Sequence, residues 1–252
     1  MNPMAFMPEH APLAVLTFLG TIGLLGLAAV VFLFAALLKR KWIALGTAAV
    51  ALLIAVAYAL VLVGVSLTSH QLVLAPGERK YFCEIDCHIA YSVAGVEEAH
   101  TLGDESHPAS ATGRFVIIHL KTWFDSDTIS PHRGNGPLAP GTRRVVLVDD
   151  RGREFAPSAN GQAALVQMRG ATPPLTQPLP PGESYVTDFV FDAPADARNL
   201  RLFVADDFPL DHFLIGHELS PLHPRIYLAL ARPVENHTTE LRGGNLSLHA
   251  AD

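Results

Sequence analysis

Two long stretches without a charged residue constrain the fold of this chain more than any other feature. No Asp, Glu, Lys or Arg occurs over residues 12–38 or over residues 42–67. Each stretch exceeds the roughly 20 residues that an α-helix needs to cross the hydrocarbon core of a bilayer. The sequence therefore predicts two transmembrane helices, which form a membrane α-hairpin within residues 1–69.

A cleaved signal peptide is the alternative explanation for the first stretch. However, no positively charged segment precedes it, and it is longer than the roughly 7–15 residues of a signal peptide's apolar region. A second span also follows it. We therefore expect the first stretch to remain in the protein as a membrane helix.

The basic residues near the two stretches predict the orientation of the hairpin. Lys39, Arg40 and Lys41 lie between the spans, and Glu9 is the only other Asp, Glu, Lys or Arg before residue 70. Because short cytoplasmic loops are enriched in Lys and Arg, we expect this loop to be inside and both ends of the chain outside. The expected location is a bacterial inner or cytoplasmic membrane, with residues 70 onward in the periplasm or at the cell exterior.

The remainder of the chain is acidic. The whole sequence contains 24 Asp and Glu against 18 Lys and Arg, and three of those 18 lie between the spans. A nucleic-acid partner is not expected, because phosphate binding requires clustered basic residues. The expected partners are the lipid bilayer and a protein or cell-envelope component.

Alternating apolar and polar residues after the second span predict a β-domain. Over residues 80–93 the odd positions are apolar and most even positions are polar, which is the pattern of one half-buried strand. Further short runs, separated by Gly- and Pro-rich turns, predict strands over 115–124, 144–148, 185–191, 200–204 and 226–230, and one short helix over 163–168. An all-β antiparallel sandwich over 70–232 is the expected fold, with a disordered polar tail over 233–252.

Several of these segments resemble a known family. The strand 115–120, the turn 148–155 with Asp149-Asp150-Arg151-Gly152-Arg153, and the segments 179–183 and 189–194 look like the telokin-like, immunoglobulin-like domain of bacterial surface proteins. The resemblance covers roughly residues 80–232 and rests on structural turns. It implies an immunoglobulin-like sandwich, an extracytoplasmic location and no established catalytic residues.

The chain departs from this family in its anchor. Many members of the family are lipoproteins, but the residues that precede Cys83 form no lipobox. Anchoring to the membrane therefore falls to the two helices.

The two cysteines form the motif Cys83-x-x-x-Cys87-His88. In an oxidising compartment two cysteines commonly form a disulfide. Four residues along one extended strand, however, separate their Cα atoms by about 13 Å. A disulfide requires about 4.4–6.8 Å. An unbroken strand therefore argues against a disulfide within the chain.

Three interpretations of this motif remain open. The alternation favours Cys83 and Cys87 as buried thiols on the core face of the strand. The second interpretation is a metal or thiol-redox site in which both thiolates and His88 bind copper or zinc, which requires a bulge in the strand. The third is a variant c-type haem attachment site. We expect no cofactor, with copper as the alternative.

Other histidines offer weaker candidates for a metal site. His212, His217 and His223 lie close together in the sequence, and His217-Glu218 is half of a zincin motif. The second histidine of that motif is missing, so a polar loop is the favoured interpretation. His119 alternates with apolar residues in its strand, which predicts a satisfied histidine at the surface or at the edge of the core.

The carboxylates and the nucleophiles predict no catalytic pair. Asp149-Asp150 and Asp206-Asp207 lie in predicted turns, where Asp is favoured by local hydrogen bonds. No Gly-x-Ser-x-Gly motif for a serine hydrolase occurs. The sequence therefore predicts a non-catalytic binding module, with a copper-handling or thiol-redox protein as the alternative.

Overall fold

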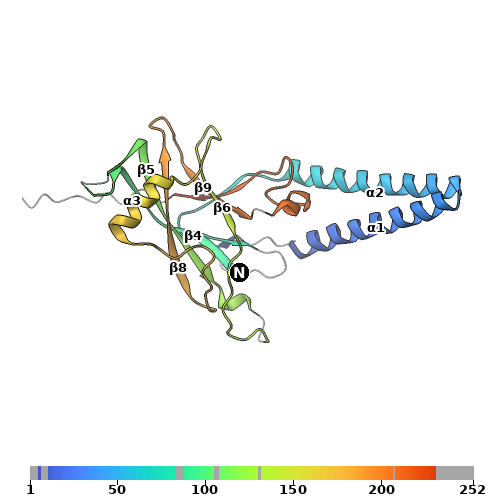
Figure 1. Ribbon diagram of the computed structural model, residues 1–252, viewed down its shortest axis with the longest axis horizontal. Helices are drawn as coiled ribbons and strands as arrows, with labels where there is room; N and C mark the ends of the chain where they lie inside the picture. The colour runs from blue at the N-terminus through green and yellow to red at the C-terminus, as the bar shows by residue number, and fades with distance from the viewer. Residues whose placement is uncertain are drawn as a thin grey trace, which may run out of the picture.

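The computed structural model of the chain describes residues 5–6, 11–82, 88–104, 108–129, 132–206 and 208–230. A hairpin of two long helices projects from one end of a β-rich domain (Figure 1). The predicted tail over residues 233–252 lies outside the described residues.

The two helices confirm the hairpin predicted from the charge-free stretches. They are α1 (Ala11–Leu37) and α2 (Lys41–Thr68), and each is long and apolar enough to cross a membrane. The basic turn between them lies at the end of the hairpin farthest from the β-domain (Figure 1). The rings of Phe18 and Tyr58 pack between the helices with their centroids 6.4 Å apart.

The described strands form two five-stranded sheets. The first has the order β1-β3-β4-β5-β8 and contains β1 (Ala5–Phe6), β3 (Arg79–Phe82), β4 (Ile89–Leu102), β5 (Ala109–Phe124) and β8 (Ser184–Ala193). The second has the order β2-β10-β9-β6-β7 and contains β2 (Leu72–Leu74), β10 (Ile226–Ala229), β9 (Arg201–Asp206), β6 (Arg143–Val148) and β7 (Glu154–Phe155). The five strands predicted after residue 110 are thereby confirmed as β5, β6, β8, β9 and β10.

The strand pairing is mixed rather than wholly antiparallel as predicted. β1 pairs with β3 in parallel, and β2 pairs with β10 in parallel, whereas the other strand pairs are antiparallel. β2 leaves directly from α2, and β10 follows a loop that contacts α2. Both strands therefore start at the hairpin end of the domain and run in the same direction.

The prediction of one unbroken strand over residues 80–93 is wrong. Phe82 at the end of β3 pairs antiparallel with Ile89 at the start of β4, so the chain reverses between them. The sequence pattern did not reveal this reversal because the odd positions stay apolar from Tyr81 to Val93, on both sides of it. Residues on opposite sides of this reversal do not lie along one extended strand, so the separation of about 13 Å does not apply to them.

The two sheets enclose one hydrophobic core, and a helix covers the outer face of the first sheet. Fully buried residues from both sheets meet in the core, among them Val116, Leu120, Leu147 and Leu202. Helix α3 (Ala159–Arg169) packs on the other face of β5 and β8 and contains the helix predicted over 163–168. Two 3₁₀ helices, η1 (Ser126–Thr128) and η2 (Pro209–Phe213), lie in loops.

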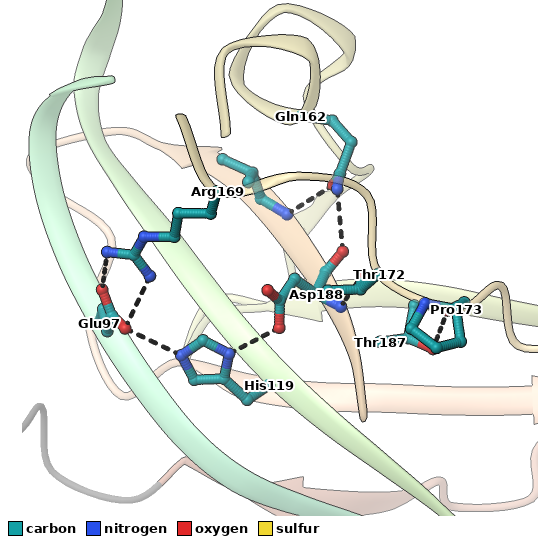
Figure 2. Close-up of polar contacts among 9 residues, drawn as sticks. Glu97, His119, Gln162, Arg169, Thr172, Pro173, Thr187 and Asp188 are labelled. Atoms are coloured by element: carbon teal, nitrogen blue, oxygen red, sulfur yellow. Dashed lines mark hydrogen bonds and ion pairs between the residues drawn. The ribbon is translucent and has the colours of Figure 1, made fainter. Parts of the chain in front are cut away.

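Helix α3 also pairs with the outer edge of β8. The Gln162 side-chain amide donates to the carbonyl of Asp188 at 3.0 Å, and its carbonyl accepts from the backbone N–H of Val190 at 3.1 Å (Figure 2). The N–H of Ser158 donates to the carbonyl of Val190 at 2.7 Å, and the N–H of Asp188 donates to Thr172 Oγ1 at 3.0 Å. Side chains and loop backbone thus replace a further strand along this part of β8.

Candidate functional site

The structure describes one residue of the predicted Cys83, Cys87 and His88 site. His88 is buried, its Nδ1 lies 2.7 Å from Thr128 Oγ1, and its ring stacks on Phe124 with a centroid distance of 5.7 Å. Cys83 and Cys87 lie outside the described residues, and so do the thiol, disulfide, copper and haem hypotheses that depend on them. His88 contributes to the packing between β4 and η1.

A buried ion pair lies at the hairpin end of the domain. The Lys80 side chain is 2 % exposed, and its Nζ donates to Glu218 Oε1 at 2.7 Å and Oε2 at 2.8 Å. It also donates to the carbonyls of Val204 at 2.7 Å and Ile226 at 3.1 Å. Burial lowers the pKa of Lys80, and the adjacent Glu218 carboxylate opposes that effect. Glu218, which the sequence suggested as half of a zincin motif, therefore balances a buried cation.

A second ion pair lies next to this one. The guanidinium of Arg143 donates to the carboxylate of Asp206, and it lies over the ring of Phe82 at 4.5 Å. Asp206 is the last residue of β9 and not part of a turn, which corrects the prediction for this residue; Asp207 lies outside the described residues. Ligand atoms of Asp206, Asp211 and His217 lie within 4.8 Å of one another, but Arg143 already neutralises Asp206. We therefore interpret the group as part of an ion-pair network.

The three clustered histidines bind the backbone of their own loop. His212 Nδ1 lies 2.7 Å from the carbonyl of Leu219, and His223 Nδ1 lies 2.8 Å from that of Pro224. The N–H of Leu219 donates to His217 Nδ1 at 3.2 Å. These contacts agree with the prediction of a polar loop that leads into the last strand.

His217 makes the stability of the domain sensitive to acid. Burial, followed by the nearby positive charge of Lys80, lowers the pKa of His217 to about 4. The unfolded chain takes up a proton on this residue near pH 6.5, whereas the folded chain does so only near pH 4. We expect the free energy of unfolding to be maximal above pH 6.5 and to fall by about 1–2 kcal/mol by pH 5.

Urea titrations of the full chain in nanodiscs at several pH values would measure this slope. His217→Asn keeps an acceptor for the N–H of Leu219 but does not titrate, so it should lose this contribution to the slope. An unchanged slope in His217→Asn would show that other groups cause the acid sensitivity.

A histidine between two carboxylates lies on the outer face of the first sheet. His119 Nδ1 lies 2.6 Å from Asp188 Oδ1, and His119 Nε2 lies 3.1 Å from Glu97 Oε1 (Figure 2). Arg169 of α3 donates to both oxygens of Glu97 at 3.0 and 2.8 Å. The hydrogen bonds from Arg169 lower the pKa of Glu97 although burial opposes them. The network links β4, β5 and β8 to α3.

This network has a structural rather than a catalytic role. Both ring nitrogens of His119 face carboxylates, so neither is available to activate a nucleophile as a general base requires. Gly95 lies beside the ring, and a Cβ at this position would come within 3.1 Å of His119 Cδ2. The prediction of a satisfied histidine is confirmed, whereas its partners, 69 and 22 positions away in the sequence, were missed. A glycine inside a strand was the available signal of a close approach.

A groove of about 400 Å³ lies on the same face of the first sheet. The guanidinium of Arg79 lies 3.3 Å from the centre of the Trp123 ring, and Lys121 lines the same groove with Ser92. No carboxylate among the described residues forms an ion pair with Arg79 or Lys121. The groove therefore combines an aromatic ring with two cations that have no such ion-pair partner.

The predicted turn at Asp149 is confirmed. Asp149 is fully buried, its Oδ1 accepts from the N–H groups of Arg151 at 3.0 Å and Arg153 at 2.8 Å, and its Oδ2 accepts from Arg153 Nε at 2.7 Å. Burial raises the pKa of Asp149, but the hydrogen bonds from Arg153 and Arg151 outweigh it and lower the pKa overall. Asp149 holds the turn between β6 and β7.

Comparisons with known proteins provide no family and no activity. No known protein family matches the sequence, and no curated protein matches it. A crystal structure of a conserved hypothetical protein from Bacillus anthracis is 17% identical, and the match covers 50% of this chain and 88% of that one with a TM-score of 0.36. At this level of similarity the match supports no conclusion about function.

Proposed function

We propose that this protein is a membrane-anchored, non-catalytic binding module, whose immunoglobulin-like domain binds an anionic protein or cell-envelope partner. The groove on the first sheet supports this proposal best. Trp and Arg are enriched at the centres of protein interfaces, and Arg79 stacked on Trp123 presents both in one place. The chain as a whole carries a formal charge of −6, so a hollow with two cations is a local reversal of charge that favours an anionic group.

The positions of the basic turn and the β-domain support an extracytoplasmic location. The two features lie at opposite ends of the hairpin (Figure 1). If α1 and α2 cross the cytoplasmic membrane with Lys39, Arg40 and Lys41 inside, the β-domain lies outside. We propose a bacterial inner or cytoplasmic membrane, with both ends of the chain and the domain on the outer side.

The turn at Asp149 is the observation that favours the proposed telokin-like, immunoglobulin-like assignment. Asp149 organises the turn of the Asp-x-x-Gly-Arg-x-Phe type on which the resemblance depends. Two facing sheets around one core are compatible with a sandwich, and the parallel pairs occur in addition to the antiparallel meander. The copper or thiol-redox alternative depends on Cys83 and Cys87, and no contact of a described residue favours it.

Binding of model polyanions tests the proposed function. The full chain in nanodiscs of uncharged lipid would be titrated with a polyglutamate peptide, which offers carboxylates, and with polyphosphate, which offers phosphates. We expect one of them to bind in the Arg79 and Lys121 groove. The double variant Arg79→Ala, Lys121→Ala should weaken binding at least about tenfold, because it removes both cations from one hollow.

A matched variant controls for net charge. Arg151→Ala, Arg198→Ala removes two exposed cations elsewhere on the domain and should change affinity by less than about twofold. Thermal melts of both double variants would confirm that they fold. Equal losses in the two double variants, or no binding of either polyanion, would contradict the proposed function.

A further inference from the structure

A loop between β9 and β10 presents its apolar side chains outward. We call residues 208–223 the η2 loop. After residue 68, eight large apolar side chains are exposed among the described residues, and six lie next to the end of α2, on β2 or on the η2 loop: Leu72, Val73, Phe208, Leu210, Phe213 and Leu222. On the η2 loop their exposed fractions are 54% for Phe208, 44% for Leu210, 53% for Phe213 and 69% for Leu222. Exposed apolar side chains that lie together in this way are typical of a surface that contacts a membrane or another protein.

Both carboxylates and the serine of the η2 loop point the other way, whereas His212 is exposed. Asp211, Glu218 and Ser220 are buried, and Glu218 forms the ion pair with Lys80 inside the domain. A loop in water would expose its carboxylates and bury its phenylalanines. The η2 loop has the reverse distribution, which suits an apolar surrounding.

The η2 loop lies against the second membrane helix. The hydroxyl of Tyr58 in α2 donates to the carbonyl of Phe213 at 2.6 Å. A Cβ at Gly216 would lie 3.7 Å from Val65 Cγ1, so this part of the loop also contacts α2. The loop occupies the space beside α2 at the domain end of the hairpin (Figure 1).

Helix geometry places this contact within the bilayer. Tyr58 precedes the end of α2 at Thr68 by about ten residues, or roughly 15 Å of helix. With 28 residues α2 is roughly 42 Å long, which exceeds a hydrocarbon core of roughly 30 Å by about 12 Å. Even with the whole excess at the domain end, Tyr58 lies below the surface of the core.

The backbone of the η2 loop is suited to this depth. Polar backbone groups within the hydrocarbon region need partners in the protein. The carbonyl of Phe213 accepts from Tyr58, and successive turns pair the N–H groups of Asp211, Leu214, His217, Ser220 and His223 with carbonyls of the same loop. The cost of placing an irregular segment in lipid is thereby reduced.

We propose that the η2 loop inserts Phe208, Leu210, Phe213 and Leu222 among the acyl chains of the outer leaflet and seats the β-domain on the bilayer. The inference depends on the proposed membrane placement of α1 and α2. The occupant of this apolar surface is lipid, because the surface is continuous with a helix long and apolar enough to span the membrane.

Photo-crosslinking to lipid tests this inference. p-Benzoylphenylalanine would replace Phe213, Leu60 or Val166 in the full chain, reconstituted in vesicles of phosphatidylcholine and phosphatidylglycerol that contain tritiated phosphatidylcholine. Leu60 is an exposed residue of α2, and Val166 is an exposed residue of α3, far from the hairpin (Figure 1). We expect labelling at Phe213 similar to that at Leu60 and at least about tenfold above that at Val166.

Each outcome distinguishes this inference from the proposed membrane placement. Labelling at Leu60 but not at Phe213 would overturn the insertion of the loop and leave the membrane placement standing. No labelling at either position would overturn the membrane placement itself. Adducts with a second polypeptide at Phe213, in place of lipid, overturn the inference in favour of a protein interface. A second probe at Phe208 repeats the test at an independent position of the loop.

Discussion

Replacing Glu218 by leucine should lower the free energy of unfolding of the β-domain by about 3–5 kcal/mol, which is the usual cost of removing one partner from a buried ion pair. Lys80 is 2 % exposed, and both oxygens of Glu218 accept from its ammonium group. The carbonyls of Val204 and Ile226 would remain as acceptors, but they carry no full charge to balance the cation. Urea titration of the full chain in nanodiscs, followed by the β-sheet circular dichroism signal, would measure the loss.

The double variant Lys80→Met, Glu218→Leu provides the matched control. It removes both charges and keeps similar side-chain volumes, so most of the lost stability should return. A cycle of the two single variants and the double variant separates the pair energy from effects of each side chain. A loss below about 1 kcal/mol in Glu218→Leu would show that water reaches the pair in solution.

Replacing Gly113 by alanine should lower the free energy of unfolding by about 3 kcal/mol, at the upper end of the range for overpacking. A Cβ at Gly113 would lie 2.4 Å from the carbonyl oxygen of Ala193 and 2.5 Å from the backbone nitrogen of Ala195. These are main-chain atoms, so β5 would have to move away from the turn after β8. The paired residues on either side of Gly113 would move with it.

The control for Gly113→Ala is Gly136→Ala. A Cβ at Gly136 meets no atom within 4 Å, so this variant should change the free energy of unfolding by less than about 0.5 kcal/mol. Thermal and urea unfolding of both variants would test the pair. Similar stability in Gly113→Ala and Gly136→Ala would contradict a close approach between β5 and the turn.

Local patterns in the sequence predicted the elements of the fold better than their arrangement. Absence of charge over two stretches was sufficient for α1 and α2, because crossing a bilayer depends on length and hydrophobicity. Runs of β-branched and aromatic residues located β5, β6, β8, β9 and β10. The reversal between Phe82 and Ile89 was missed because the odd positions stay apolar on both sides of it.

Long-range partners explain why the charged sites were missed. The sequence pattern places Lys80 among the polar positions of an alternating strand, and its partner Glu218 lies 138 positions away. Arg143 and Asp206 face each other only because β6 and β9 are neighbours in the second sheet. In the same way, His119 meets Asp188 through the register of β5 and β8. Periodicity describes which face a residue occupies but not which residue it meets there.

The pairing of Gln162 with the edge of β8 has a consequence if α1 and α2 hold the protein in a membrane, as proposed above. Copies held in two dimensions with a common orientation meet edge to edge far more often than they would in solution. An open strand edge on such copies is a template for intermolecular β-sheet and for aggregation. The carboxamide of Gln162 occupies the carbonyl of Asp188 and the N–H of Val190, the groups through which a second copy would add a strand. Helix α3 thus protects this edge of β8 against pairing with a second copy, which would matter most under the proposed membrane placement.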